Sequence, residues 1–485
     1  MALPGLSLPG LGQLQPIGGS TSNAGHDARP QQSHTEDIAA RTEWRFEVAF
    51  NQSYSIKLLS GQAEIFGVEL APKQAYVLSG VKGSVFTWQG CQLEITGDAE
   101  SEYAGQETEY AVEWLNVHGM LETVRDETPQ DGPRVVVVGP DSVGKSSLVQ
   151  SLAGWAVKVD RTPTVVNADP REGLLAPPGT ITAATVGSQL DVENGYGIAP
   201  ISGSTMTPVK TPLVYHCPYS SPAEKPNVYK ALLTRTALSV TNRLEEDPIA
   251  KQSGIIIDTP GSLNDPKSGY DVISHLISEF SINLILTIGS ERLYNDLNRK
   301  YGTSKSNGDP AIPVLRITKP GGAVEQDAAF MDQLRHQQIH QYFFGTHKER
   351  MNPHSHTIPF SDLTVYRANS PALTAALQFD SFANSGGAED MDDTSYASKP
   401  GASGADFEKV TPSNDMLGRL CAIKFADSKA DEVTVRDSAV MGFAYVAEVD
   451  ETKKRVRFLA PHPQRWGDRV MVFGGYPGVV VDLVA

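Results

Sequence analysis

The sequence predicts a multidomain α/β protein: a central P-loop (phosphate-binding loop) domain with a parallel α/β sheet, flanked by an N-terminal small β-domain and a C-terminal mixed α+β domain. Three patterns support this prediction. Short alternating runs punctuated by glycines fill residues 37–128, apolar runs alternate with helix-length segments over 129–345, and β-like runs return over 346–485. The 485 residues suffice for about two to four domains of ordinary size.

The composition is that of a globular protein, with 40% hydrophobic and 20% charged residues. The 41 Lys and Arg residues against 57 Asp and Glu residues give a net charge of −16, which argues against nucleic-acid binding by bulk electrostatics. Three widely separated cysteines, Cys91, Cys217 and Cys421, indicate a reducing compartment rather than a disulfide framework or a cysteine zinc site. No apolar run reaches the roughly 18 residues that a membrane span needs, so no membrane association is expected.

Two segments are expected to be disordered. Residues 1–36 are rich in Gly, Pro, Ser and Gln, and they lack the basic and apolar regions of a secretory signal, so they predict a disordered tail. Residues 381–414, inside the C-terminal domain, are dominated by Gly, Ser, Asp and Ala. This composition predicts a disordered insert, because it holds too little apolar surface to fold alone.

The N-terminal region has the pattern of a small β-sandwich or barrel. Residues 44–48 alternate between polar and apolar side chains, and so do the runs near 63–68 and 85–88, with glycines between them. Residues 111–124 predict a helix that leads into the central domain.

The central domain opens with the strongest motif of the chain. The β-branched run 135–138 is followed by Gly139-Pro140-Asp141-Ser142-Val143-Gly144-Lys145-Ser146, which matches the Walker A pattern G-x-x-x-x-G-K-[ST], and then by a predicted helix over 145–159. Such a loop surrounds phosphates with backbone N–H groups at the positive end of a helix. We expect ATP to bind at Gly139, Asp141, Ser142, Val143, Gly144, Lys145, Ser146 and Ser147. Lys145 would reach the β and γ phosphates, and Ser146 would ligate Mg²⁺.

Two carboxylates follow predicted strands of the same sheet and are candidate Mg²⁺ partners. Asp258 ends the apolar run 254–258, as in a Walker B strand, and Asp169 comes directly after the strand 164–167. Asp169 is also a candidate to orient a hydroxyl nucleophile. The alternatives stay open: Asp258 simply ends a strand, and Asp169 simply forms a turn before Pro170.

A predicted helix over 290–300 carries Arg292, Arg299 and Lys300. In phosphoryl transfer a mobile arginine can stabilise the transferring group. The alternative is a solvated helix face on which Asp296 pairs with Lys300.

These motifs, taken together, resemble the Clp family of eukaryotic pre-mRNA cleavage and polyadenylation factors, relatives of the polynucleotide 5′-hydroxyl kinases. The resemblance extends from about Thr42 to Leu483 and has a fungal-type, degenerate kinase motif. Besides the P-loop, its segments are Thr42–Glu47, Gly61–Gly67, Val85–Cys91, Pro212–His216, Glu291–Asn295 and Lys319–Gly322.

The resemblance implies that Glu43 and Lys82, in the N-terminal domain, contact the adenine base of ATP. It implies a nuclear subunit that is required for endonucleolytic cleavage in pre-mRNA 3′-end formation, with ATP as a mainly structural ligand. The implied partners are a large cleavage-factor scaffold subunit that binds the RNA polymerase II tail and other 3′-end processing subunits. Pre-mRNA would be contacted indirectly, through these partners.

The chain departs from the active kinases on the acceptor side. Those enzymes carry D-x-G-Q-G, whereas this sequence reads Asp169-Pro170-Arg171-Glu172-Gly173, and Ser262 stands where they carry an aromatic residue. Enzymatic activity therefore stays open, and the sequence favours its absence. The alternative is an active ATP-dependent 5′-hydroxyl kinase acting on RNA, with Asp169, Lys145 and Arg292 as catalytic residues. A GTPase-like switch, suggested by Asp258–Gly261 alone, is a third reading, which the missing N-K-x-D signature disfavours.

Overall fold

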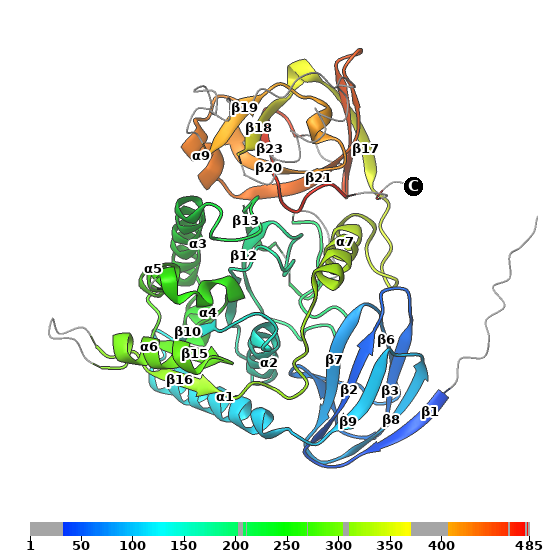
Figure 1. The fold of residues 1–485 in the computed structure, drawn as a ribbon, viewed down its shortest axis with the longest axis vertical. Coiled ribbons are helices and arrows are strands. Elements are labelled where there is room, and N and C mark those ends of the chain that lie inside the picture. Colours follow the sequence, from blue (N-terminus) through cyan, green and yellow to red (C-terminus); the bar gives the residue numbers. More distant parts are fainter. Residues whose placement is uncertain are drawn as a thin grey trace, which may run out of the picture.

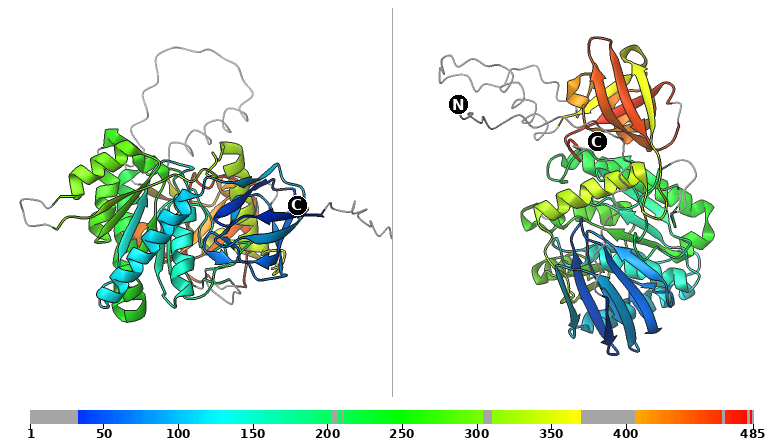
Figure 2. Two further views of the ribbon diagram at one scale, coloured as in Figure 1. Left: turned by 90° about the horizontal axis from the view of Figure 1, so that it is seen from below. Right: turned by 90° about the vertical axis from the view of Figure 1, so that its right-hand side faces the viewer.

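The computed structural model describes residues 33–201, 207–209, 211–268, 270–303, 310–369, 406–463, 466–480 and 483. The N-terminal β-domain and the C-terminal domain lie at opposite ends of the central domain (Figure 1). Helix α7 (Ala328–Phe344) crosses between them, as the side view shows (Figure 2). The predicted fold class is confirmed. The tail over 1–32 and the insert over 381–405, both expected to be disordered, lie outside the described residues.

The N-terminal domain is a β-sandwich of two antiparallel sheets. In order, the first contains β1 (Ser33–Ile38), β8 (Cys91–Gly97), β3 (Tyr54–Gly61) and β6 (Ala75–Leu78). The second contains β5 (Val68–Glu69), β4 (Glu64–Ile65), β7 (Val81–Thr87), β2 (Thr42–Val48) and β9 (Ser101–Gly105). Alternate side chains such as Tyr54, Ile56 and Leu58 are buried between the sheets.

The expectation that the disordered tail extends to residue 36 is wrong. Residues 33–36 belong to β1, which pairs with β8 from Ser33↔Thr96 to Ile38↔Cys91. The strand lies at the edge of its sheet, and most of its side chains are polar and at least partly exposed. Backbone pairing, and not burial of side chains, holds this strand in place. Its polar composition therefore resembles that of a tail.

Helix α1 (Glu109–Glu127) joins the sandwich to the central domain, as predicted. Its buried residues Trp114, Val117 and Leu121 pack in the same core as residues of α2 (Lys145–Lys158).

The central sheet has the order β13 (Leu213–His216), β12 (Thr180–Thr185), β11 (Thr164–Asn167), β14 (Ile255–Asp258), β10 (Arg134–Val138), β15 (Leu284–Ile288), β16 (Val314–Ile317). The five neighbouring strands β11, β14, β10, β15 and β16 pair in parallel. Strand β12 adds an antiparallel connection to β11 and to β13, so the complete sheet is mixed. The associated helices are α2, α3 (Pro226–Glu246), α4 (Pro248–Ser253), α5 (Asp271–Glu279), α6 (Glu291–Tyr301) and α7 (Ala328–Phe344).

The C-terminal sheet has the order β17 (His354–Pro359), β22 (Arg455–Ala460), β21 (Val440–Asp450), β20 (Leu420–Asp427), β23 (Arg469–Phe473), β18 (Thr364–Ala368), β19 (Phe407–Val410), with helix α9 (Glu432–Asp437) beside it. Strand β19 corrects the expected insert 381–414, because residues 407–410 pair with β18 and the side chain of Phe407 is buried.

The C-terminal domain packs firmly on the central domain. Val214 of β13, Tyr342 of α7 and Phe443 of β21 share one buried cluster. The backbone N–H of Tyr476 also donates to the carbonyl of Pro218 over 3.2 Å. Within the described part of the chain, no helix has the length and apolar character needed to cross a membrane. The three cysteines are buried and form no disulfide.

Candidate nucleotide-binding site

The P-loop lies between the carboxyl end of β10 and the start of α2. Gly144 caps α2 with a φ of 90°, a left-handed conformation that glycine adopts without strain. Gly139 has no room for a side chain, because a Cβ atom there would lie 2.3 Å from the carbonyl oxygen of Ile288. The loop therefore depends on both motif glycines. It presents the free N–H groups of a helix start to a cleft, which is a favourable arrangement for phosphate.

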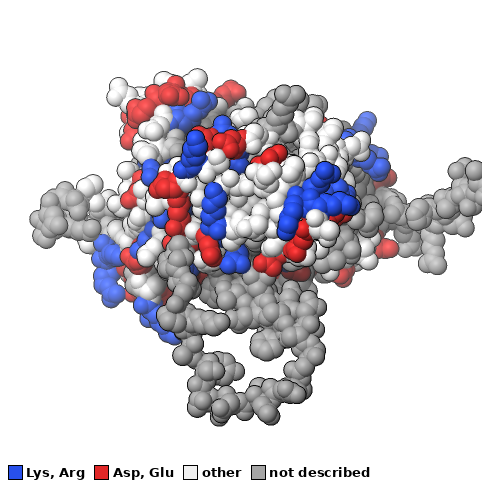
Figure 3. All heavy atoms as spheres, turned by 90° about the horizontal axis from the view of Figure 1, so that it is seen from above, with Lys and Arg blue, Asp and Glu red and all other residues white. Residues whose placement is uncertain are grey.

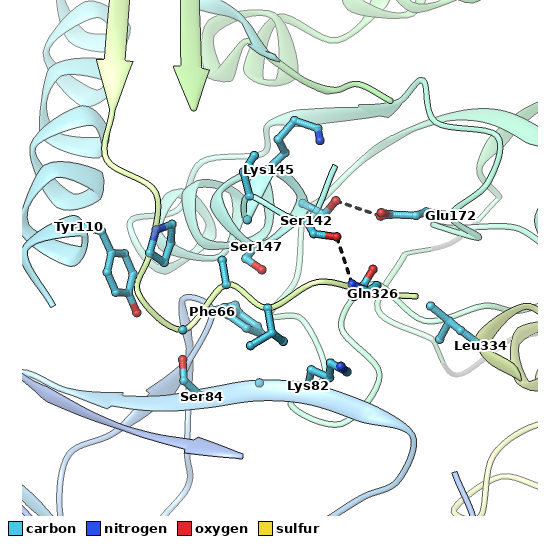
Figure 4. Close-up of a pocket in the computed structure, with 18 of the residues that line it drawn as sticks. Phe66, Lys82, Ser84, Tyr110, Ser142, Lys145, Ser147, Glu172, Gln326 and Leu334 are labelled. Atoms are coloured by element: carbon cyan, nitrogen blue, oxygen red, sulfur yellow. Dashed lines mark hydrogen bonds between the residues drawn. The ribbon is translucent and has the colours of Figure 1, made fainter. Parts of the chain in front are cut away.

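The cleft beside this loop is bounded by segments of the N-terminal region and of the central domain. It has an empty volume of about 1040 Å³, including its open mouth. The P-loop residues Ser142–Ser147 line one side, β7 and α1 of the N-terminal region line another, and the segment 320–338 lines a third (Figure 4). Its wall includes Glu43, Phe66, Lys82, Tyr110, Trp114, Glu172, Pro320, Gly322, Gln326 and Gln338.

At the P-loop end, the two motif side chains are both engaged within the protein. Lys145 Nζ donates to the carbonyl oxygen of Pro140 over 2.6 Å, so the ammonium group is directed back at the loop itself. Ser146 Oγ donates to Glu172 Oε2 over 2.9 Å. A hydroxyl has one proton and two lone pairs, so this bond leaves the lone pairs of Ser146 available to a cation.

Buried carboxylates surround Ser146. Asp258 and Asp169 are 2% and 3% exposed, and Asp258 Oδ1 has no hydrogen-bond partner among the described residues. Burial raises the pKa of Asp258 to about 6, with Lys145 and Ser146 opposing the shift and Asp169 adding to it. Burial, with the charges of Asp169 and Asp258, raises the pKa of Glu172 to about 7.

The donor set fits Mg²⁺ that is shared with a bound phosphate chain. The unpartnered oxygen of Asp258 and the lone pairs of Ser146 are hard oxygen ligands, which Mg²⁺ prefers. Among the described residues, no group of three or more His, Cys, Asp or Glu side chains forms a self-contained metal site. A cation there would therefore take its other ligands from phosphate and water.

Asp141 lies outside the cleft wall, although the motif suggested otherwise. Its carboxylate accepts the N–H of Gly261 over 3.1 Å and pairs with Arg171, whose Nη2 lies 2.5 Å from Asp141 Oδ1. Arg171 also contacts both carboxylate oxygens of Asp169, over 3.3 and 3.0 Å. Burial opposes ionisation of Asp141, but Arg171 outweighs it and holds the pKa of Asp141 below its usual value.

The opposite end of the cleft is aromatic and contains one buried carboxylate. Glu43 is 1% exposed, accepts Arg45 Nε at Oε1 over 2.5 Å, and accepts the hydroxyl of Tyr110 at Oε2. Phe66 and Trp114 line the cleft with Tyr110 (Figure 4). This end therefore offers flat apolar surface and an oriented acceptor, which suits a planar heterocycle that carries an amino group.

Lys82, on β7, also lines the cleft. Its ammonium group forms a 3.0 Å ion pair with Glu47 and lies 3.3 Å from the carbonyl oxygen of Glu325.

The segment between β16 and α7, together with α7 itself, closes the cleft and was not predicted to do so. Gln326 N donates to Ser142 Oγ over 3.2 Å, and Gly173 forms two hydrogen bonds with the side chain of Gln338. At Gly322 a Cβ atom would lie 2.8 Å from Arg45 Nε. The sequence signal for this closure was the pair of glycines after Pro320. Glycine has no side chain, so it allows another segment to approach the backbone closely.

Several predicted site residues do not reach the cleft. Of the described residues, Gly139, Asp141, Asp169, Asp258 and Arg292 are absent from its lining, although Asp169 and Asp258 interact with Glu172 beside it.

The arginines of α6 lie on the exposed face of that helix. The side chain of Arg292 is 75% exposed and its Nε lies 3.9 Å from Asp296, which also pairs with Arg299. The buried residues Leu293 and Leu297 fix the inner face of the helix, so these cations face solvent.

Three family models match the chain. The model described as "mRNA cleavage and polyadenylation factor CLP1 P-loop" matches residues 139–345. The "N-terminal beta-sandwich domain of polyadenylation factor" matches residues 37–128. The "Pre-mRNA cleavage complex II protein Clp1" model matches residues 351–477.

Fungal relatives match over the full length. The mRNA cleavage and polyadenylation factor clp1 of Botryotinia fuckeliana is 42% identical over 485 residues, which cover 99% of this chain and 100% of the relative. The corresponding factor of Phaeosphaeria nodorum is 43% identical over 494 residues, with the same coverage.

Two solved structures of a more distant relative have the same fold. A complex of wild-type Clp1p with Pcf11p (454–563) has a TM-score of 0.78 at 26% identity and covers 92% of this chain and 98% of that one. The second describes the extended interface between Pcf11p and Clp1p and the basis for ATP loss in a point mutant. It has the same TM-score and identity, and covers 92% of this chain and 99% of that one.

Proposed function

Because the chain belongs to the Clp1 family of mRNA cleavage and polyadenylation factors, we propose that it is an ATP-binding subunit required for endonucleolytic cleavage in polyadenylation-dependent pre-mRNA 3′-end formation. In this proposal ATP is mainly a structural ligand. The supporting observation is the cleft, whose wall combines the P-loop, the N-terminal β-domain with α1, and the 320–338 segment. A ligand that binds only this closed arrangement stabilises it by about 4 kcal/mol at a thousandfold excess over Kd.

The two ends of the cleft match the two ends of ATP. The phosphates would lie on the N–H groups of Ser142–Ser147, and the adenine beside Tyr110 and Trp114. Glu43 is positioned to accept the adenine amino group, because Arg45 and Tyr110 fix its carboxylate as an acceptor. Lys82 would complete the base end.

Ser146 and Asp258 would hold Mg²⁺, with Asp169 near enough to add to the field of negative charge around it. The ion would neutralise the phosphate charge. Without a cation, the buried carboxylates would oppose a triphosphate, because like charges in a partly desolvated site repel strongly.

The proposal that ATP is held rather than consumed rests on one contact. Asp169, which would receive the acceptor hydroxyl, is paired with Arg171. The 5′-hydroxyl kinase alternative retains Asp169 and Lys145, but it would need another cation in the role suggested for Arg292.

For partners, we extend to this chain what the solved relatives show for Clp1p, which is bound to a Pcf11p fragment. The chain would bind a large cleavage-factor scaffold subunit that also binds the RNA polymerase II tail, together with other 3′-end processing subunits, in the nucleus. Pre-mRNA would be reached through these partners. The net charge of −16 supports indirect contact, and so does the mixture of acidic and basic side chains on the face shown in Figure 3.

The nucleotide proposal is tested by the double substitution Lys145→Ala with Ser146→Ala. We expect purified wild-type protein to carry about one ATP per chain and the double variant to carry none, measured by chromatography of the released nucleotide. A matched control is Lys251→Ala with Ser278→Ala, since Lys251 pairs with Glu245 on the surface and Ser278 is exposed. Equal ATP in the double variant and the wild type would show that the site is misplaced. Competition with GTP separates the GTPase-like reading, which requires GTP to be preferred.

The partner proposal is tested by affinity purification of the tagged protein from nuclear extract, followed by mass spectrometry. We expect a cleavage-factor scaffold subunit to be recovered with the wild type and with the surface control. Stable recovery of unrelated cytosolic machinery in its place would contradict the proposal.

A further inference from the structure

Arg171 joins two carboxylates with a single guanidinium group. Toward Asp169 it donates from Nε and Nη2 over 3.3 and 3.0 Å, and toward Asp141 it donates from Nη1 and Nη2 over 3.2 and 2.5 Å. Both contacts are therefore two-pronged, the geometry in which arginine binds carboxylates most strongly. The backbone N–H of Arg171 adds a 2.9 Å bond to Asp169 Oδ1.

These contacts connect three loops at the carboxyl ends of neighbouring strands. Asp169 and Arg171 follow β11, Asp141 belongs to the P-loop after β10, and Gly261, whose N–H donates to Asp141 Oδ1, follows β14. A side chain at Gly261 would collide with Asp141, since a Cβ atom would lie 2.1 Å from its Oδ1. In α/β sheets, ligands enter the crevice at these strand ends. Arg171 thus joins the strand ends that carry Asp169 and Asp141.

The C-terminal region supports the same arginine from outside. The hydroxyl of Tyr476 donates to the carbonyl oxygen of Arg171 over 3.1 Å. The ring of Tyr476 also lies 5.7 Å from the guanidinium carbon of Arg335 on α7. The position of Arg171 is therefore fixed by its own two ion pairs and by a residue that follows β23.

The side chain of Asp169 is consequently covered. It is 5% exposed, whereas that of Arg171 is 31% exposed, so solvent meets the guanidinium before it meets the carboxylate. Both oxygens of Asp169 accept hydrogen bonds from Arg171. A hydroxyl that approached Asp169 to give up its proton would have to displace an arginine that is hydrogen-bonded to both carboxylate oxygens.

We propose that Arg171 is a specificity-determining residue that occupies the acceptor position beside Asp169, so that the cleft admits a nucleoside triphosphate and excludes the 5′-hydroxyl end of a polynucleotide. This inference rests on the proposed nucleotide site. Arg171 covers the Asp169 carboxylate, so an acceptor hydroxyl would not reach it, and the arginine does not act as a phosphate-binding group.

The test measures binding of a fluorescent 5′-hydroxyl RNA oligonucleotide by anisotropy, to protein saturated with Mg²⁺ and a non-hydrolysable ATP analogue. Arg171→Gly should bind the RNA at least about tenfold more tightly than the wild type, because it removes the side chain that covers Asp169. Arg171→Lys should give a smaller gain, because an ammonium group cannot form both two-pronged contacts. A 5′-phosphorylated oligonucleotide should gain less, because Asp169 and Glu172 would repel its terminal charge.

Arg161→Gly is the matched control. Arg161 also joins two carboxylates, Glu122 and Asp126, over 2.8 and 2.6 Å, but neither is part of the cleft wall. It should leave RNA binding at the wild-type level. The proposal is overturned if neither Arg171 variant, with a wild-type melting profile, binds the 5′-hydroxyl RNA better than Arg161→Gly does.

Nucleotide content is measured on the same samples. If the wild type holds no nucleotide, the proposed ATP site fails, while the comparison of Arg171→Gly with Arg161→Gly in nucleotide-free protein still decides the role of Arg171. A gain confined to Arg171 variants supports the inference, and equal binding in both variants overturns it.

Discussion

Ser146 donates its hydroxyl proton to Glu172, with 2.9 Å between Ser146 Oγ and Glu172 Oε2. By its charge alone, a carboxylate at position 172 would oppose the phosphates. The hydrogen bond shows a further role, because it fixes the orientation of the Ser146 hydroxyl and leaves its lone pairs for a cation. The change from the Gln of active kinases to Glu172 is therefore compatible with nucleotide binding.

Glu172→Gln is expected to stabilise the nucleotide-free protein at alkaline pH. The pKa of Glu172 rises from its ordinary value of 4.5 to about 7 on folding, so the folded state binds the proton more tightly than the unfolded state does. Its contribution to stability is therefore present below about pH 4.5 and is lost as the pH rises through 7. The variant should gain about 1–3 kcal/mol at pH 8 and little at pH 4.5.

This gain is measured as the free energy of unfolding in urea at the two pH values. The control is Glu245→Gln, because Glu245 is 61% exposed and pairs on the surface with Lys251. An equal gain at both pH values, or an equal gain in the control, would contradict a buried Glu172 carboxylate as the cause.

Tyr110→Phe is expected to weaken ATP binding at the base end alone. Burial and the charge of Glu43 raise the pKa of Tyr110 well above its usual value, so its hydroxyl remains protonated and donates to Glu43. The hydroxyl holds Glu43 in place as an acceptor for the adenine amino group, so its loss should lower ATP affinity by roughly tenfold, or about 1.4 kcal/mol. Calorimetry with tripolyphosphate provides the control, since this ligand lacks a base. If its affinity falls as much as that of ATP, the assignment of the two ends of the cleft is wrong.

Gly322→Ala is expected to speed ATP release several-fold. A Cβ atom at this position would lie 2.8 Å from Arg45 Nε, and Arg45 is itself held by Glu43. Either the Arg45–Glu43 pair or the 320–326 segment must therefore shift, and each shift disturbs the wall of the cleft. Gly119→Ala is the matched control, because nothing lies within 4 Å of a Cβ atom there and alanine favours the helix by roughly 0.5–1 kcal/mol. Release is followed by chase with unlabelled ATP. Equal release rates in both variants would show that the segment does not retain the nucleotide.

The sequence predicts the parts of this fold whose signal is local. The continuous run Val135–Val138, the glycine loop and the helix that follows are found where expected, because a buried parallel strand and a P-loop each have a distinctive composition. Strand β12, with the sequence Thr-Ile-Thr-Ala-Ala-Thr, was missed, since its small residues form a strand only between β11 and β13. Strands β1 and β19 were missed for a related reason, because both lie at sheet edges and are largely polar.

In the candidate site, too, some features are predicted by the local sequence and others depend on tertiary contacts. The P-loop and the carboxylates at the strand ends follow from motif and order along the chain. The outward direction of Arg292 was also available from the sequence, since Leu293, Leu297 and Tyr301 recur at helical spacing and mark the buried face. The pairing of Arg171 with Asp141, the turn of Lys145 toward Pro140 and the closure by Gln326 depend on tertiary contacts between distant segments. No local pattern specifies them.

The central claim, that ATP is held as a structural ligand, is tested most directly by following labelled phosphate. Wild-type protein loaded with γ-labelled ATP and Mg²⁺ is incubated with a 5′-hydroxyl RNA oligonucleotide, with Lys145→Ala as the background, and label on the RNA is compared with intact ATP on the protein. If ATP is a structural ligand, we expect the label to remain in protein-bound ATP, at about one per chain. Lys145-dependent transfer to the RNA near ~1 s⁻¹, at the low end of kinase turnover, would contradict it.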